Sequence, residues 1–139
     1  PCGLGARDSL RLEAGFPLYG HELSEEISPL EARISFTVDF EKKDFIGRDA
    51  LKKQKEEGLS HYRIGLEMKD VGVPREGYSL IHDDEEIGEV TSGGYSPVLK
   101  KGIAMGYSRY KLSEGEEIMI EIRDEEKRAE IVSWPFHKE

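Results

Sequence analysis

The chain of 139 residues contains no asparagine and a single glutamine, Gln54, although glutamate and lysine are abundant. Proteins of thermophilic organisms often have this composition, with few thermolabile amides and many charged side chains. We therefore expect a thermophilic source. The only cysteine is Cys2, which excludes a disulfide within the chain and fits a reducing, cytoplasmic location.

Long apolar runs and an excess of positive charge are also missing. No apolar run is long enough to cross a bilayer and no signal peptide is recognisable, so we expect no membrane partner. The formal net charge of −9 disfavours nucleic acid as a partner, because binding phosphates requires a positive field. The composition, 37% apolar and 35% charged, indicates a globular protein with a heavily charged surface.

The usual signatures of metal and hydrolase sites are absent as well. The four histidines are scattered, and residues 21–25 lack the second histidine of a helical zinc motif. The acidic run 83–86 lacks the glycine and the alternating carboxylates of a calcium loop. No serine stands in a G-x-S-x-G setting. The glycine-containing segment 91–97 lacks the ending of a phosphate-binding loop, so we interpret it as a tight β-turn and predict no metal site.

The most distinctive stretch that is present lies at residues 3–20. Its apolar spacing predicts a short helix over residues 6–14, with Ala6, Leu10 and Ala14 on the inward face. Gly15 follows at the position where a glycine commonly ends a helix.

Arg7 would lie in the first turn of this helix, where the helix dipole disfavours a cation. Arginine is often placed despite such a cost where its planar fork must hold a carboxylate or a polar ring edge. Two interpretations stay open from the residues alone. Arg7 contacts a ligand, or it joins a structural network with Asp8, Arg11 and Glu13.

The segment that follows carries signals for three further elements. Residues 28–31, Ser-Pro-Leu-Glu, have the pattern of a helix capping box. Alternating apolar residues over 34–40 predict a half-buried strand. A second helix is predicted from about residue 47 to 57, with Ala50 and Leu51 facing inward.

From residue 60 onward, short β-prone runs are separated by turn signals. Five or six such strands at this spacing predict a small antiparallel barrel or sandwich. We expect a boundary near residue 58, with the end of an α+β domain in residues 1–57 and an all-β domain in residues 58–139. The predicted runs are 64–68, 78–80, 87–91, 103–107, 118–122 and 129–132.

Residues 2–15, Cys-Gly-Leu-Gly-Ala-Arg-Asp-Ser-Leu-Arg-Leu-Glu-Ala-Gly, resemble a motif of the aminomethyltransferases, the T-proteins of the glycine cleavage system. The resemblance covers the whole chain and corresponds to the C-terminal third of such an enzyme. It implies an antiparallel β-barrel as the C-terminal domain and, before it, the end of the folate-binding α+β domain. The chain starts at Pro1 inside a dense motif, so we expect it to be a piece of a longer protein. Other motifs keep the family's order, at residues 17–20, 28–32, 45–48, 63–66, 88–93, 96–99, 104–107 and 135–136.

The resemblance implies a reaction. The aminomethyl group carried on the lipoyl arm of the H-protein is transferred to tetrahydrofolate, which yields methylenetetrahydrofolate and ammonia. The family's catalytic aspartate lies in its N-terminal two-thirds, so we expect no catalytic residue in this chain and no activity without the remainder of the T-protein. The expected partners are the H-protein with its lipoate, tetrahydrofolate as co-substrate, and that remainder.

The resemblance also assigns site residues. Arg7 matches the motif arginine that contacts folate, and Phe16 is a candidate for the pocket wall at a position where the family varies. Arg11 and Glu13 are expected to pack the motif, and Arg63 is expected to be structural at the start of the barrel. The family makes a further folate contact from a tail, which the end of the chain at residue 139 leaves open.

Two alternatives remain beside the T-protein. Folate-dependent sarcosine- and dimethylglycine-oxidising enzymes share the fold, but their segments resemble Ser-Leu-Arg-Leu-Glu followed by a lysine and a Trp-Gly. Ala14-Gly15 and Leu18-Tyr19-Gly20 at these positions favour the T-protein. A non-catalytic docking module is the second alternative.

Overall fold

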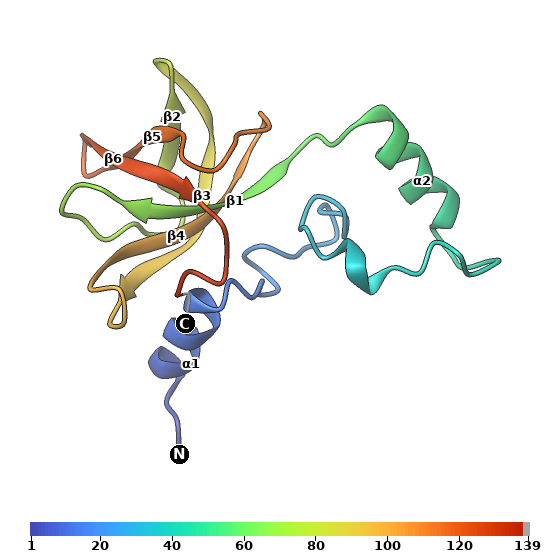
Figure 1. Ribbon diagram of the computed structural model, residues 1–139, viewed down its shortest axis with the longest axis horizontal. Coiled ribbons are helices and arrows are strands. Elements are labelled where there is room, and N and C mark those ends of the chain that lie inside the picture. Colours follow the sequence, from blue (N-terminus) through green and yellow to red (C-terminus); the bar gives the residue numbers. More distant parts are fainter. Residues whose placement is uncertain (138–139) are drawn as a thin grey trace.

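Six antiparallel strands form a closed barrel, which is the centre of the molecule (Figure 1). The structure, a computed structural model, describes residues 1–137. Around the barrel the strand order is β1-β4-β3-β2-β5-β6, so every strand has two hydrogen-bonded neighbours. This confirms the predicted antiparallel barrel. The strands are β1 (Tyr62–Met68), β2 (Ser79–His82), β3 (Glu85–Ser96), β4 (Lys101–Ser108), β5 (Glu117–Ile122) and β6 (Glu125–Val132).

Side chains that alternate along the strands fill the barrel interior. Ile64, Leu66 and Met68 point inward from β1, and Ile118 and Ile120 point inward from β5. Each of these side chains is at most 3% exposed. The period-2 pattern in the sequence therefore corresponds to the inward face of a closed sheet.

The glycines at 93 and 94 lie inside strand β3, and the prediction of a tight turn over residues 91–97 is wrong. A Cβ atom at Gly93 would lie 2.5 Å from the carbonyl oxygen of Pro74. Glycine is needed here because another backbone segment crosses close to the strand. The sequence pattern of a turn and that of a close backbone approach are the same.

Helix α1 (Leu4–Glu13) packs against β3 and β4 through its last turn. It ends as predicted at Gly15, which has a φ of 71°, and the Phe16 amide donates to the Arg11 carbonyl over 2.8 Å. The buried residues are Leu12 and Glu13, whereas Leu10 is 62% exposed. The predicted inward face was therefore wrong, because only the end of the helix reaches the barrel.

Residues 28–60 form an arm that leads away from the barrel and carries helix α2 (Arg48–Glu57) (Figure 1). The capping box is confirmed, since the Ser28 amide donates to Glu31 over 3.0 Å and the Glu31 amide donates to the Ser28 hydroxyl over 3.2 Å. The strand predicted over 34–40 is wrong. That segment contains a short 3₁₀ turn, η1 (Ser35–Thr37), because the closed barrel offers no free edge for another strand.

Helix α2 forms where it was predicted but has no buried residue. Ala50 is exposed and Leu51 is only half-buried, so the predicted inward face of this helix packs on nothing within residues 1–137. Among the same residues, no helix combines the length and the hydropathy that a membrane crossing requires.

Candidate functional site

The loop after α1 is fixed to the barrel by a buried carboxylate. Glu22 is fully buried and accepts hydrogen bonds from the Leu18 amide over 3.0 Å and from Arg11 Nη1 over 3.1 Å. Its other oxygen accepts from the Thr91 hydroxyl of β3 over 2.6 Å. A buried charge is stable only with such partners. Glu22 therefore holds the segment after the helix against β3.

Two side chains of the Arg-x-Glu motif anchor the helix itself. Arg11 donates to the Ser92 hydroxyl over 3.0 Å and to Asp8 over 2.7 Å. Glu13 is 5% exposed and accepts a hydrogen bond from Ser96. The expectation that Arg11 and Glu13 pack the motif agrees with these contacts.

Arg63, on β1, is the largest buried polar side chain of the barrel and is 1% exposed. It donates to the Ala32 carbonyl over 2.9 Å and to the Gly15 carbonyl. Burial lowers the pKa of Arg63 to about 10, and the charge of Glu22 opposes that shift. The guanidinium therefore stays charged at neutral pH and links the end of α1, the arm and the barrel.

Trp134 completes this junction. Its ring centre lies 4.2 Å from the guanidinium carbon of Arg63 and 4.4 Å from that of Arg33. A Cβ atom at Gly15 would lie 2.4 Å from Trp134 Cβ. The sequence analysis did not single out Trp134 or Glu22, because nothing local indicates that they meet residues more than 60 positions away.

The two predicted folate-contacting residues lie on either side of this anchored region. Arg7 is exposed on α1 and makes no side-chain hydrogen bond or ion pair with any residue in 1–137. Phe16 follows the end of the helix and is 65% exposed. The structural network considered for Arg7 exists, but it is built from Asp8, Arg11 and Glu22 and leaves Arg7 out.

Large exposed apolar side chains surround the same region. They lie on α1, on the loop after it and on the arm, where apolar surface of this kind marks contacts with other protein or with ligands. The residues and their exposed fractions are Leu4 83%, Leu10 62%, Phe16 65%, Tyr19 69%, Phe36 85% and Ile46 105%.

Comparison with known families explains the arrangement. Residues 62–138, more than half of the chain, match the family described as "Glycine cleavage T-protein C-terminal barrel domain". The chain belongs to this family. Residues 1–42 match a second family, described as "GCVT N-terminal domain", so both parts of the chain find counterparts in the glycine cleavage T-proteins.

Individual relatives agree with this assignment. The chain is 54% identical to the aminomethyltransferase of Thermoanaerobacter pseudethanolicus and 50% identical to that of Halalkalibacterium halodurans, over 99% of its length. It covers 38% of each of these proteins. The crystal structure of glycine cleavage system aminomethyltransferase T from Bartonella henselae matches with a TM-score of 0.90 and 36% identity, over 97% of this chain and 39% of that one. The chain therefore spans less than two fifths of the length of these relatives.

Proposed function

We propose that the chain is the C-terminal part of an aminomethyltransferase that transfers the aminomethyl group from the lipoyl H-protein to tetrahydrofolate. Ammonia and methylenetetrahydrofolate are the other products of this reaction. The observation that carries the proposal is the identity of 50–54% to proteins named aminomethyltransferase, over nearly the whole chain. The H-protein, its lipoate and tetrahydrofolate are then the partner, the carrier group and the co-substrate.

Arg7 is the residue we propose to contact folate. Its guanidinium is exposed and has no partner among residues 1–137, although Asp8 is its neighbour in sequence. An unpaired guanidinium suits a folate molecule, whose glutamate carboxylates and polar ring edge both accept hydrogen bonds from a planar fork. The bonds of Arg11 and Glu13 to the barrel would keep the helix that carries Arg7 in place.

Phe16 is proposed as part of the pocket wall. Its ring is 65% exposed, while its backbone follows Gly15, whose carbonyl accepts a hydrogen bond from Arg63. An exposed aromatic ring on a fixed backbone is suited to packing against a flat ligand.

The other part of the enzyme would supply the catalytic aspartate. We propose that residues 1–57 belong to the folate-binding α+β domain, that residues 58–139 form the β-barrel domain, and that the chain is inactive without the remainder of the T-protein. Support comes from the exposed apolar side chains of α1 and the arm, and from α2, which buries no residue. The remainder would cover these surfaces.

The proposal for Arg7 is tested in a protein that contains both this chain and the remainder. Replacing Arg7 by alanine removes a charge-assisted hydrogen bond, so we expect the Kd for tetrahydrofolate to rise by about tenfold or more in calorimetry. Arg109→Ala is the matched control, because it removes the same charge from an exposed position at the end of β4. Equal affinities of the Arg7→Ala variant and the unchanged protein would show that Arg7 is an ordinary surface residue.

A further inference from the structure

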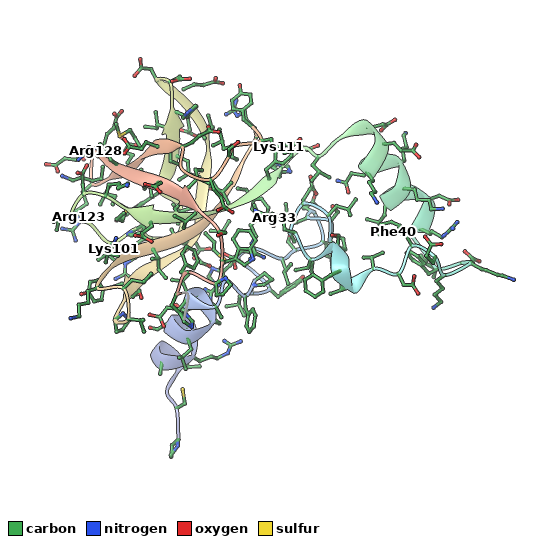
Figure 2. The ribbon with its side chains drawn as sticks, in the orientation of Figure 1. Arg33, Phe40, Lys101, Lys111, Arg123 and Arg128 are labelled. Atoms are coloured by element: carbon green, nitrogen blue, oxygen red, sulfur yellow. The ribbon has the colours of Figure 1, made fainter. Side chains whose placement is uncertain are left out.

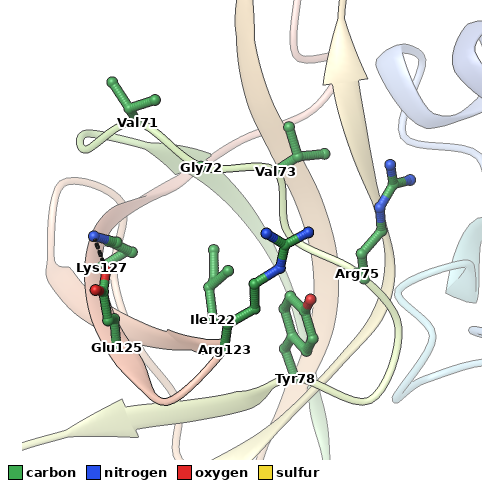
Figure 3. Close-up of a pocket in the computed structure, with 9 residues that line it drawn as sticks. All are labelled: Val71, Gly72, Val73, Arg75, Tyr78, Ile122, Arg123, Glu125 and Lys127. Carbon is green, nitrogen blue, oxygen red and sulfur yellow. Dashed lines mark ion pairs between the residues drawn. The ribbon is translucent and has the colours of Figure 1, made fainter.

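A hollow of about 630 Å³ lies on the barrel, between the β1–β2 connection and the turn that joins β5 to β6 (Figure 3). None of its lining residues belongs to α1 or to the arm. Figure 2 places Arg123, which borders the hollow, on the side of the barrel away from the arm, whereas Arg33 lies toward the arm. The hollow is therefore separate from the region proposed to bind folate.

The floor of the hollow is apolar and firmly held. Tyr78 and Ile122 line it and also pack against the barrel core. A Cβ atom at Gly72 would lie 3.1 Å from Ile122 Cδ1, so the β1–β2 connection lies directly against β5. A ring or an aliphatic group in the hollow would thus rest on side chains fixed by the core.

The rim of the hollow carries more positive than negative charge. Arg75, Arg123 and Lys127 face a single lining carboxylate, that of Glu125, which is paired with Lys127 (Figure 3). Arg75 and Arg123 make no ion pair and no side-chain hydrogen bond with any residue in 1–137. Two unpaired guanidinium groups thus share one hollow in a chain whose formal net charge is −9.

This concentration is unusual among the arginines of the chain. Six of the nine have a partner in the described region, either a carboxylate or the ring of Trp134. The three without one are Arg7, Arg75 and Arg123, although the chain offers 29 acidic residues. Two of these three border the same hollow.

The backbone at Arg123 adds a second indication. Arg123 and Asp124 form the turn between β5 and β6 with φ values of 53° and 64°, which favour asparagine or glycine. The turn geometry therefore does not explain an arginine here. Figure 3 shows the Arg123 side chain rising from this turn beside the Tyr78 ring, with its guanidinium over the hollow.

We propose that this hollow binds a small molecule with two or more phosphate groups attached to a ring or another apolar body. The forks of Arg75 and Arg123 match phosphate oxygens, and the formal surplus of two positive charges on the rim offsets the ligand's charge. The Tyr78 ring and Ile122 provide the surface for the body of the ligand. The volume lies within the range of small-molecule sites.

The test titrates the full chain with two probes, inorganic pyrophosphate and ADP, and follows backbone amide signals by NMR. We expect saturable binding of both, shifts confined to residues 70–78 and 120–128, and tighter binding of ADP because its ring packs on the floor. Arg75→Gln and Arg123→Gln should each weaken ADP by about tenfold or more. Both side chains are exposed, so these variants should keep the fold.

Two controls make the result decisive. Arg109→Gln removes an equal charge from another exposed position and should leave both affinities unchanged. Tyr78→Leu should reduce the affinity for ADP to that for pyrophosphate. Absence of saturable binding, shifts outside these two segments, or an equal loss in Arg109→Gln would overturn the site. ADP binding no tighter than pyrophosphate would overturn the role of the apolar floor.

Discussion

At the scale of single residues, Arg63, Gly15 and Trp134 decide how the region after α1 is positioned. Arg63 donates to the Gly15 carbonyl and stacks on Trp134, and the Trp134 side chain occupies the space that any side chain at position 15 would need. The resemblance to the T-proteins predicted a structural role for Arg63. Its partners could not be predicted, because they lie at distant positions in the sequence.

Replacing Gly15 by alanine should lower the free energy of unfolding by about 2–4 kcal/mol, because the left-handed φ and the clash with Trp134 both add a cost. Urea unfolding of the isolated chain measures this. Gly20→Ala is the matched control, since Gly20 has a φ of 89° but no atom within 4 Å of the added Cβ. It should cost only about 1 kcal/mol, and equal losses in the two variants would contradict the contact with Trp134.

Arg63→Met should lower the free energy of unfolding by about 2–4 kcal/mol, because the carbonyls of Gly15 and Ala32 lose their buried donors. Arg33→Met removes a guanidinium that stacks on the same Trp134 ring but is exposed, and should cost about 1 kcal/mol or less. The same unfolding assay compares the two. A loss in Arg63→Met as small as that in Arg33→Met would contradict the proposed role of the buried donors.

At the scale of elements, the barrel strands could be predicted and the arm could not. Each strand run in residues 60–132 alternates apolar and polar side chains, and in a closed sheet each finds two neighbours. The same alternation over residues 34–40 produced no strand, because no sheet edge is available to it within the described region. Alternation indicates a strand only where a partner exists, and the sequence does not contain that information.

The capping box before the arm should make stability depend on pH. Burial raises the pKa of Glu31, but hydrogen bonds from the Ser28 amide and from His61 lower it more, so the net shift is downward. The unfolded chain then binds the proton more readily. The contribution of Glu31 is complete above the ordinary carboxyl pKa and is lost as the pH falls through the lower, folded-state value.

Unfolding free energies measured between neutral and acidic pH test this dependence. Glu31→Gln removes the titrating group, so the variant should be less stable at neutral pH and should approach the unchanged protein in acid. A constant difference across the pH range would contradict a titrating role for Glu31.

At the scale of the whole molecule, the barrel is complete while the surface around α1 and the arm is not. The barrel closes on itself and buries its core, but large apolar side chains of α1 and the arm remain exposed. The chain also covers only 38% of the aminomethyltransferases that it resembles. These observations support the proposal that the folate site and the catalysis need a further segment.

The most direct measurement is an assay of aminomethyl transfer with H-protein carrying the aminomethyl group and with tetrahydrofolate. The chain is assayed alone and after the remainder of a T-protein is added as a separate polypeptide. We expect no methylenetetrahydrofolate above the uncatalysed background from the chain alone, and formation of it with the remainder present. Transfer by the chain alone would contradict the proposal that its catalytic residue lies elsewhere.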